Sequence, residues 1–254
     1  MRPLETFPRA LTSSRQESSA AKRQVDALTR SNAHLKDIAA RGVDVIARET
    51  PGRSSWGPTD SCLSAGPDPV ATRIVGRIFA LRTRFRKGDA IYHAGGSFDA
   101  LYAIRYGSCK RVLLGRSGEE QVAAYHMVGD IIGMDGIADG RHQCQAIALE
   151  DVEVARLPFD KIEYLARLSD QFAHDVHTLL AREGARAHAV LLILGTMRAE
   201  QRLAVFLLDL SDRYRARGYS PYEFVLRMTR QEIGSYLGLT LETVSRLFSR
   251  FHRE

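Results

Sequence analysis

The stretch TRQEIGSYLGLTLETVSRLFSRF, residues 229–251, decides the fold of the C-terminal part of the chain. Thr229 and Glu232 stand three residues apart, as in a capping box, which predicts that a helix begins at this point. Gly238 permits a tight turn after that helix, and Thr240 is a suitable N-cap for a second helix. Two short helices joined by such a turn form a helix-turn-helix, a common motif for placing a helix in the major groove of DNA.

The second predicted helix has an apolar face and a polar face. Starting at Val244, apolar residues recur at i, i+3, i+4 and i+7 and should point inward. On the polar face, Arg246 can donate two hydrogen bonds to a guanine, and Glu242 can accept one from a cytosine. The alternative is that Glu242 and Arg246 form an ordinary i,i+4 ion pair on the surface. We expect the bases to be read by Glu242, Ser245 and Arg246, and the DNA backbone to be contacted by Arg230, Thr240, Thr243, Ser249 and Arg250.

Basic residues gather in the same region. The whole chain has a formal net charge of +6, and the part from Arg213 onward holds eight arginines and four glutamates. Positive charge around a helix-turn-helix favours double-stranded DNA as the partner. The sequence contains no G-x-S-x-G motif, no phosphate-binding loop and no suitably spaced pair of carboxylates. We therefore expect neither an enzyme nor catalytic residues.

The composition is that of a globular protein. Of the 254 residues, 44% are hydrophobic and 26% are charged. No apolar run approaches the roughly 20 residues that cross a bilayer, and residues 1–14 lack the apolar core of a secretory signal. A cytoplasmic protein without a membrane partner is therefore expected. Cys62, Cys109 and Cys144 form no C-x-x-C pair, so the sequence predicts neither a disulfide framework nor a zinc site.

Four parts follow one another along the chain. Residues 1–65 are rich in Ser, Arg, Gly and Pro and are expected to be largely disordered, with a marginal helix over residues 25–49. Residues 66–168 contain short strand-like runs separated by glycine turns, which predicts an antiparallel β-roll. Residues 169–197 should form one long helix, and residues 198–254 the helix-turn-helix domain. The sequence therefore predicts an α+β fold.

The long helix carries an extended apolar stripe. Apolar residues recur at spacings of three and four from Phe172 to Leu194, and such a stripe needs a partner. The stripe is interpreted either as the seam of a homodimer or as a face packed on the chain's own β-roll. Beyond it, residues 198–218 should form another helix and residues 219–228 a turn with a short strand. The residues proposed for the dimer seam are Val176, Leu180, Ala187, Val190, Leu191 and Leu194.

Several blocks, in order, resemble the CRP/FNR superfamily of bacterial transcription regulators, and its FNR type in particular. They include RKGDAIYHAGGSFDALYAIRYG at 86–107, HMVGDIIGMDGI at 126–137 and the E-x-x-S-R core of the helix-turn-helix. The resemblance runs from about Cys62 to Phe251. It implies a β-roll like a cyclic-nucleotide-binding domain, a dimerising helix and a C-terminal winged helix. It also implies that TTGAT-like palindromic half-sites are read by Glu242, Ser245 and Arg246, and that transcription is activated through contact with RNA polymerase.

The resemblance also bears on cofactors. FNR-type regulators with an oxygen-labile [4Fe–4S] cluster carry four cysteine ligands, and only Cys62 is matched here. The other positions hold Arg53, Trp56 and Ala155. We therefore expect no intact cluster, no other metal site and no cofactor. The alternative is a haem-based or thiol-based redox or gas sensor on the same scaffold, with candidate residues Cys62, Cys144, His126, His142, His174, His177 and His188.

Cyclic AMP is not expected as a ligand either. In the relatives that bind it, an acidic residue and an Arg–Ser pair hold the nucleotide. The matching positions here are Met134 and Gln143–Cys144. The anionic phosphate would therefore lose its bidentate partner.

The relatives implied by the resemblance continue past the second helix into a two-stranded wing. Only three residues follow Phe251 in this sequence, so we expect the wing to be missing. Val244, Phe248 or Phe251 should then be partly uncovered. Affinity for DNA should be reduced, because phosphate contacts supply much of it.

Overall fold

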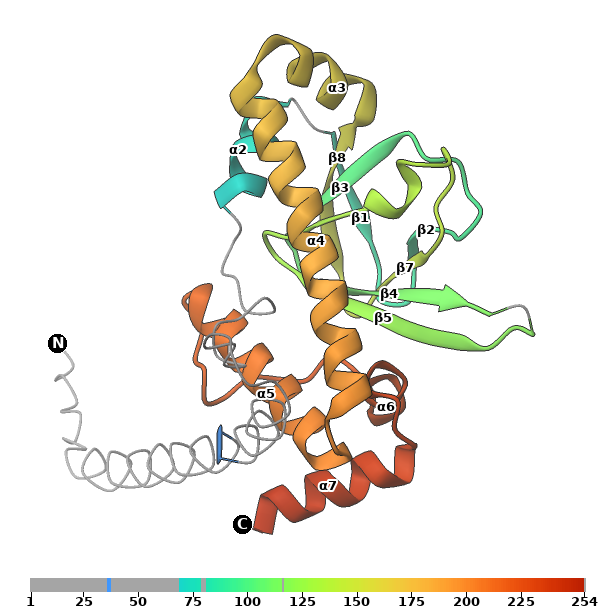
Figure 1. The fold of residues 1–254 in the computed structure, drawn as a ribbon, viewed down its shortest axis with the longest axis vertical. Coiled ribbons are helices and arrows are strands. Elements are labelled where there is room, and N and C mark those ends of the chain that lie inside the picture. Colours follow the sequence, from blue (N-terminus) through green and yellow to red (C-terminus); the bar gives the residue numbers. More distant parts are fainter. Residues whose placement is uncertain (1–35, 38–68, 79–80, 116, 254) are drawn as a thin grey trace, which may run out of the picture.

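The fold is α+β, as predicted (Figure 1). Strands form a roll, and one long helix runs from the side of the roll down to the C-terminal helices. The disorder predicted for residues 1–65 and the helix predicted within them fall outside the described part, apart from Lys36 and Asp37, which are helical. The computed structural model describes residues 36–37, 69–78, 81–115 and 117–253.

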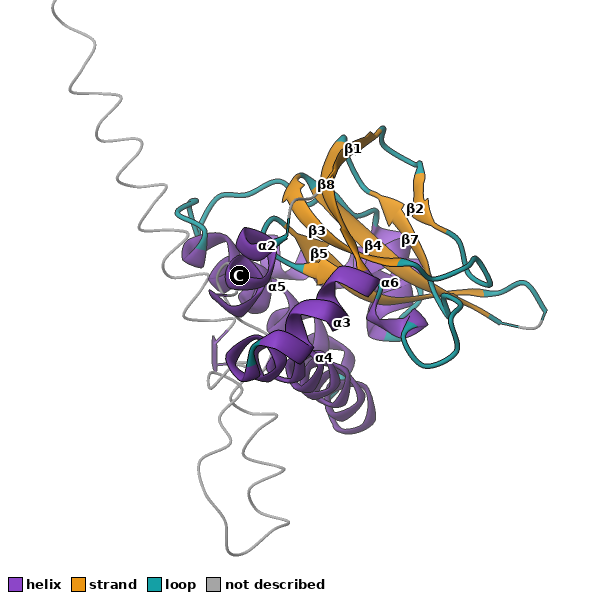
Figure 2. Cartoon of the chain, turned by 90° about the horizontal axis from the view of Figure 1, so that it is seen from above, coloured by secondary structure: helices purple, strands orange, loops and turns teal. Residues whose placement is uncertain are grey.

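Two four-stranded antiparallel sheets make up the roll (Figure 2). One has the strand order β1-β8-β3-β6 and the other β2-β7-β4-β5. Side chains from both sheets, among them Ile104, Cys109 and Val154, form the apolar core between them. The strands are β1 (Leu81–Phe85), β2 (Ala90–Tyr92), β3 (Ala100–Tyr106), β4 (Ser108–Leu114), β5 (Glu120–Met127), β6 (Ile131–Ile132), β7 (Gln145–Ala148) and β8 (Val152–Pro158).

Strand β8 is buried on both faces. Val152 and Val154 point into the core between the sheets, whereas Ala155 and Leu157 point toward the covering helices. This explains why only Glu153 and Arg156 interrupt the apolar sequence of β8. The prediction of an antiparallel β-roll from short strand-like runs within residues 66–168 is confirmed.

Three helices cover the outer face of the β1-β8-β3-β6 sheet. They are α2 (Pro69–Arg77), α3 (Phe159–Leu168) and α4 (Asp170–Thr196), and they share a core with β3 and β8. The prediction of α4 as one long helix is confirmed, whereas α2 was missed. Arg73 of α2 donates two hydrogen bonds, of 2.9 and 2.6 Å, to Asp175 of α4. These bonds lower the pKa of Asp175 to about 2, so the pair stays ionised.

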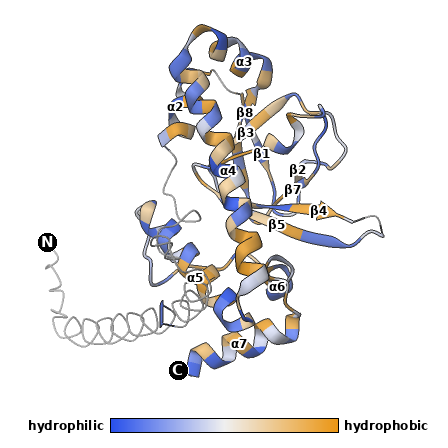
Figure 3. Cartoon of the chain, in the orientation of Figure 1, coloured by the Kyte–Doolittle hydropathy of each residue, from blue (hydrophilic) through white to orange (hydrophobic). Residues whose placement is uncertain are grey.

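The apolar stripe of α4 packs on the roll in its N-terminal part and is exposed farther along the helix. Val176 packs with Phe172 and Leu179 against the chain's own roll, as the alternative interpretation holds. Farther along, Ala187 and Leu191 are exposed, and Leu191 keeps 66% of its surface. The C-terminal half of α4 therefore presents apolar surface to solvent (Figure 3). Within the described chain, no helix is both long enough and apolar enough to cross a membrane.

The C-terminal helices share a core with the β4–β5 hairpin. They are α5 (Ala199–Ala216), α6 (Arg230–Leu237) and α7 (Leu241–Arg253). Of the three residues among which partial exposure was expected, Val244 is completely buried in this core. The cause is the close packing of α6 across it, since a Cβ added to Gly234 would lie 3.5 Å from a Val244 methyl group. Phe248 and Phe251 are partly buried.

The short strand predicted within residues 219–228 is wrong. The segment is irregular, and its alternating apolar residues Phe224, Leu226 and Met228 pack against the helical core. The alternating apolar residues, which suggested a strand, therefore pack on the helical core and do not belong to a paired strand.

One arginine joins the ends of two helices. The guanidinium of Arg202 donates to the backbone oxygens of Leu194 and Met197 at the end of α4, at 2.6 and 2.9 Å. It also donates to the oxygen of Leu237 at the end of α6, at 3.0 Å. Carbonyl groups at helix ends lack intrahelical partners, so Arg202 satisfies both ends at once.

Candidate nucleic-acid interface

Helix α6 begins with the predicted capping box. Thr229 Oγ1 accepts a hydrogen bond from the Glu232 amide at 3.2 Å, and the Glu232 carboxylate accepts one from the Thr229 amide at 2.6 Å. The same carboxylate pairs with Lys110 of β4 at 2.6 Å. Burial raises the pKa of Glu232, but the hydrogen bonds from Lys110 and Thr229 outweigh burial and lower its pKa overall. Glu232 therefore both completes the capping box and connects α6 to the roll.

The turn between α6 and α7 depends on two glycines. Gly238 adopts a left-handed conformation with φ of 62°, as the predicted turn requires. Gly234 was not singled out in the sequence, yet a Cβ at this position would lie 2.6 Å from the Leu239 oxygen. The close approach of the turn to α6 therefore excludes a side chain at Gly234.

Helix α7 presents the predicted base-reading residues on its outer side. Glu242 and Arg246 are exposed and Ser245 is partly exposed, while Val244 is buried. A hydrogen bond from its own backbone amide, followed by one from Thr240, lowers the pKa of Glu242, so the side chain is an ionised acceptor. Arg246 does not form the alternative i,i+4 ion pair with Glu242; it donates to Thr243 Oγ1 at 3.3 Å.

The residues predicted to contact the DNA backbone make different contacts within the protein. Thr240 caps α7, because its Oγ1 accepts from the Thr243 amide at 3.2 Å. Ser249 donates to the Ser245 backbone oxygen at 3.0 Å. Arg230 lies over the ring of Phe248, with 5.7 Å from its guanidinium carbon to the ring centroid.

Arg250 differs from the other candidates because it reaches back to a neighbouring helix. It forms a 3.2 Å ion pair with Glu200 of α5, while half of its side chain stays exposed. Arg250 therefore lies where α7 meets α5.

Comparison with known proteins agrees with this architecture. Residues 82–168 match the family described as "Cyclic nucleotide-binding domain", and residues 226–254 match "Bacterial regulatory proteins, crp family". The transcriptional regulatory protein btr of Bordetella pertussis is 44% identical over 193 residues, which are 76% of this chain and 80% of that protein. The chain belongs to the CRP/FNR family of transcriptional regulators.

Two further proteins illustrate the breadth of the similarity. The transcriptional activator protein Anr of Pseudomonas protegens is 39% identical over 168 residues, which are 66% of this chain and 69% of Anr. The solved structure of FixK2 from Bradyrhizobium japonicum is 31% identical, with a TM-score of 0.62. The similarity to FixK2 covers 69% of this chain and 86% of that chain.

The loop between β6 and β7 contains Met134, Gln143 and Cys144, the positions that the resemblance assigns to nucleotide binding. In this CRP/FNR chain, Asp135 Oδ2 accepts hydrogen bonds from the amides of Gln143 and Cys144, at 2.8 and 2.9 Å. Tyr92 donates to the other oxygen at 3.4 Å and stacks on His142 at 3.9 Å between ring centroids. An internal carboxylate therefore occupies the backbone donors that could bind an anion. We did not identify Asp135 from the sequence.

The described cysteines lie inside the roll. Cys109 and Cys144 are buried free thiols, and burial raises the pKa of both. Thiols of this kind react poorly, because the thiolate is the reactive form. Cys62 lies outside the described residues. Among the residues that the structure describes, no three His, Cys, Asp or Glu side chains are grouped so that they could hold a metal ion.

The candidate histidines divide into two groups. His126 and His142 are buried in the roll. His174, His177 and His188 are exposed along α4.

Proposed function

We propose that this regulator binds TTGAT-like palindromic half-sites through α7, with Glu242, Ser245 and Arg246 reading the bases. The observation that carries the proposal is the exposed, ionised face of a helix whose opposite side is packed in the core. Arg246 supplies planar donors for guanine, and Glu242 supplies an acceptor for cytosine. Because these two side chains do not pair with each other, both remain available to DNA.

The proposed base reading can be tested by mobility shift on a TTGAT palindrome and on scrambled DNA. Arg246→Ala should weaken binding to the palindrome by at least about fivefold per half-site, because a bidentate contact to guanine is lost. Arg215→Ala is the matched control: it removes the same charge from an exposed position on α5, where Arg215 pairs with Asp212 at 3.0 Å. Equal binding to both DNAs, or full binding by the Arg246 variant, would contradict the proposal.

We also propose that the protein acts as a homodimer joined along α4. Support comes from the exposed Ala187 and Leu191 and from the partly exposed Leu180, which lie at helical spacing. A palindromic site requires a two-fold partner, and a dimer supplies two copies of α7.

For the signal, we propose that neither an intact [4Fe–4S] cluster nor cyclic AMP is used. The cluster has one matched cysteine, Cys62, and Asp135 already holds the loop amides that a nucleotide phosphate would need. The buried thiols of Cys109 and Cys144 do not favour redox sensing. An absorption spectrum of protein purified without oxygen tests the part about the cluster: an iron–sulfur band would refute it, whereas a Soret band would support the haem-based alternative.

We further propose that the protein activates transcription through RNA polymerase. The similar protein Anr is named a transcriptional activator. On this chain the projecting β4–β5 hairpin exposes Leu113 and Leu114 beside a polar tip, which gives polymerase an accessible surface. In vitro transcription from a promoter with the palindrome checks this, and unchanged transcript levels would contradict it.

A further inference from the structure

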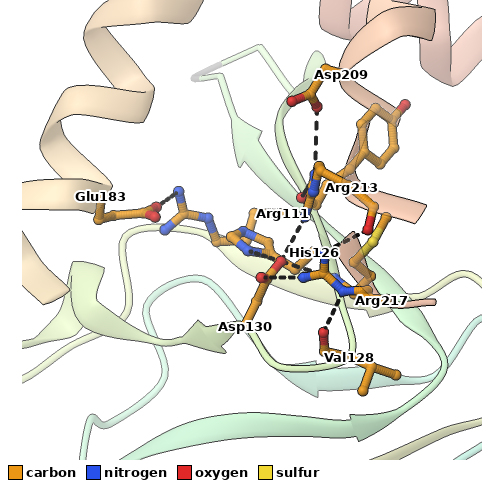
Figure 4. A network of polar contacts seen from close by, with 10 residues as sticks. Arg111, His126, Val128, Asp130, Glu183, Asp209, Arg213 and Arg217 are labelled. Carbon is orange, nitrogen blue, oxygen red and sulfur yellow. Dashed lines mark hydrogen bonds and ion pairs between the residues drawn. The ribbon is translucent and has the colours of Figure 1, made fainter. Parts of the chain in front are cut away.

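A small cavity lies where the roll, the long helix and the C-terminal helices meet. Its volume is about 60 Å³. Its walls come from β4, β5, α4, α5 and α6, and Figure 4 shows the polar network around it. The cavity is separate from the β6–β7 loop that Asp135 fills. The lining residues that matter here are Arg111, Tyr125, His126, Glu183, Asp209 and Arg213.

Unpartnered polar atoms are concentrated around this cavity. In the described part of the chain, six buried side-chain nitrogen or oxygen atoms lack a hydrogen-bond partner, and five of them belong to residues that line it. His126 and Tyr125 are only 3% and 6% exposed. Buried polar groups are normally satisfied, so such a cluster indicates a site for a polar molecule. The five atoms are Arg111 Nε, Tyr125 Oη, His126 Nδ1 and Nε2, and Asp209 Oδ1.

The charges around the cavity leave one positive charge in excess. Arg111 pairs with Glu183 at 2.5 Å, and Arg213 pairs with Asp130 at 2.6 Å. The charged residues that line the cavity are three arginines, Arg111, Arg186 and Arg213, and two carboxylates, Glu183 and Asp209. Behind the cavity, Arg217 also pairs with Asp130.

The excess of positive charge also affects the pKa of His126. Burial, and then the positive charges of Arg111 and Arg213, hold the pKa of His126 well below its usual value. The ring is therefore neutral, with one N–H donor and one acceptor nitrogen. A negative charge in the cavity would oppose the repulsion between these cationic groups.

We propose that this cavity binds a small monovalent oxyanion, of the nitrate or carboxylate type. Arg111 Nε, the Tyr125 hydroxyl and the N–H of His126 supply three hydrogen-bond donors. One water needs roughly 10–15 Å³ of such space, so the cavity has room for about four to six non-hydrogen atoms. A nucleotide is far too large.

Asp209 is the one acidic group with an unsatisfied atom in the cavity. Burial raises the pKa of Asp209 to about 6, although the positive charge of Arg213 acts to lower it. Its ionised form repels an anion, whereas its protonated form can donate a hydrogen bond to one. The site should therefore bind the oxyanion more tightly when Asp209 carries no charge.

Titration calorimetry on the full chain without DNA tests the site. Sodium nitrate and sodium formate are the two probes, inorganic and carboxylate, and potassium chloride keeps the ionic strength constant. We expect saturable binding with about one anion per chain. Tyr125→Phe should weaken it by about fivefold, the effect of one lost hydrogen bond. The fold should tolerate this change, because the deleted hydroxyl has no partner in the protein.

Two further variants keep the test decisive. Tyr214→Phe makes the same change outside the cavity and should leave binding unaltered. Asp209→Asn should tighten binding, because it removes a negative charge and keeps a donor. Absence of saturable binding by both probes would overturn the proposal, as would binding that Tyr125→Phe and Asp209→Asn leave unchanged. Tighter binding of inorganic phosphate would overturn the assigned class of anion.

Discussion

At the scale of single residues, the contacts that a side chain makes in the folded protein decide its role. Asp135 is a clear case, since its carboxylate accepts from the amides of Gln143 and Cys144. Two amides of this loop are thereby satisfied from within the chain. The proposal that cyclic AMP is not the signal rests on this contact together with Met134 and Gln143 at the matched positions.

At the same scale, Asp209 should make stability depend on pH. Burial raises its pKa to about 6 in the folded protein, against about 3.9 in the unfolded chain. The folded state therefore holds a proton that the unfolded state releases between about pH 4 and pH 6. The free energy of unfolding contributed by this group falls as the pH rises through that window. Arg213 and Arg186 oppose the shift, whereas Asp130 and Asp212 add to it.

Urea unfolding at about pH 5 and about pH 7.5 checks this prediction. The wild type should lose about 1 kcal/mol more than Asp209→Asn between the two conditions, because the variant cannot titrate at this position. An identical pH dependence in the two proteins would show that Asp209 does not titrate in this range.

Among the elements, α6 connects the two halves of the molecule. Its Ser235 Oγ accepts from the Val122 amide of β5 at 2.9 Å, and Glu232 pairs with Lys110 of β4. Tyr236 of α6 also packs edge-on against Tyr125 of β5, with 5.1 Å between ring centroids. The helix that supports α7 is therefore anchored to the roll by polar and aromatic contacts.

The capping box of α6 should contribute measurably to stability. Thr229→Ala removes the acceptor for the Glu232 amide and should lower the free energy of unfolding by about 1 kcal/mol. Thr229→Ser keeps a hydroxyl at the same place and should change stability much less. Urea denaturation of the three proteins measures the difference. Equal losses in the two variants would indicate that the lost methyl group, and not the cap, matters.

For the whole molecule, the decisive surface is the C-terminal half of α4. Leu191→Glu should convert a dimer into a monomer, because it places a charge in the proposed apolar seam. Leu168→Glu is the matched control, since Leu168 on α3 is 65% exposed against 66% for Leu191. Sedimentation velocity reports the oligomeric state of each protein. A monomeric wild type, or a dimer that survives Leu191→Glu, would refute the seam.

Local patterns were sufficient for much of this protein. The capping box at Thr229, the turn at Gly238, the limits of α4 and the inward position of Val244 all follow from residues within a few positions of one another. Hydrogen bonds in caps and helical periodicity act over that range, so the sequence alone determines them. The same holds for the exposure of Glu242 and Arg246, since it depends on which face of α7 is apolar.

Only the tertiary structure decided which distant segments meet. Lys110 and Glu232 are 122 residues apart, and Arg73 and Asp175 are 102 apart. No local pattern specifies such pairs, because they depend on how the two sheets and the long helix are arranged. The cavity around His126 and the internal ligand Asp135 arise in the same way. The sequence by itself determined which face of α7 is polar and exposed, and the packing of the roll against α4, α5 and α6 decided what supports that helix.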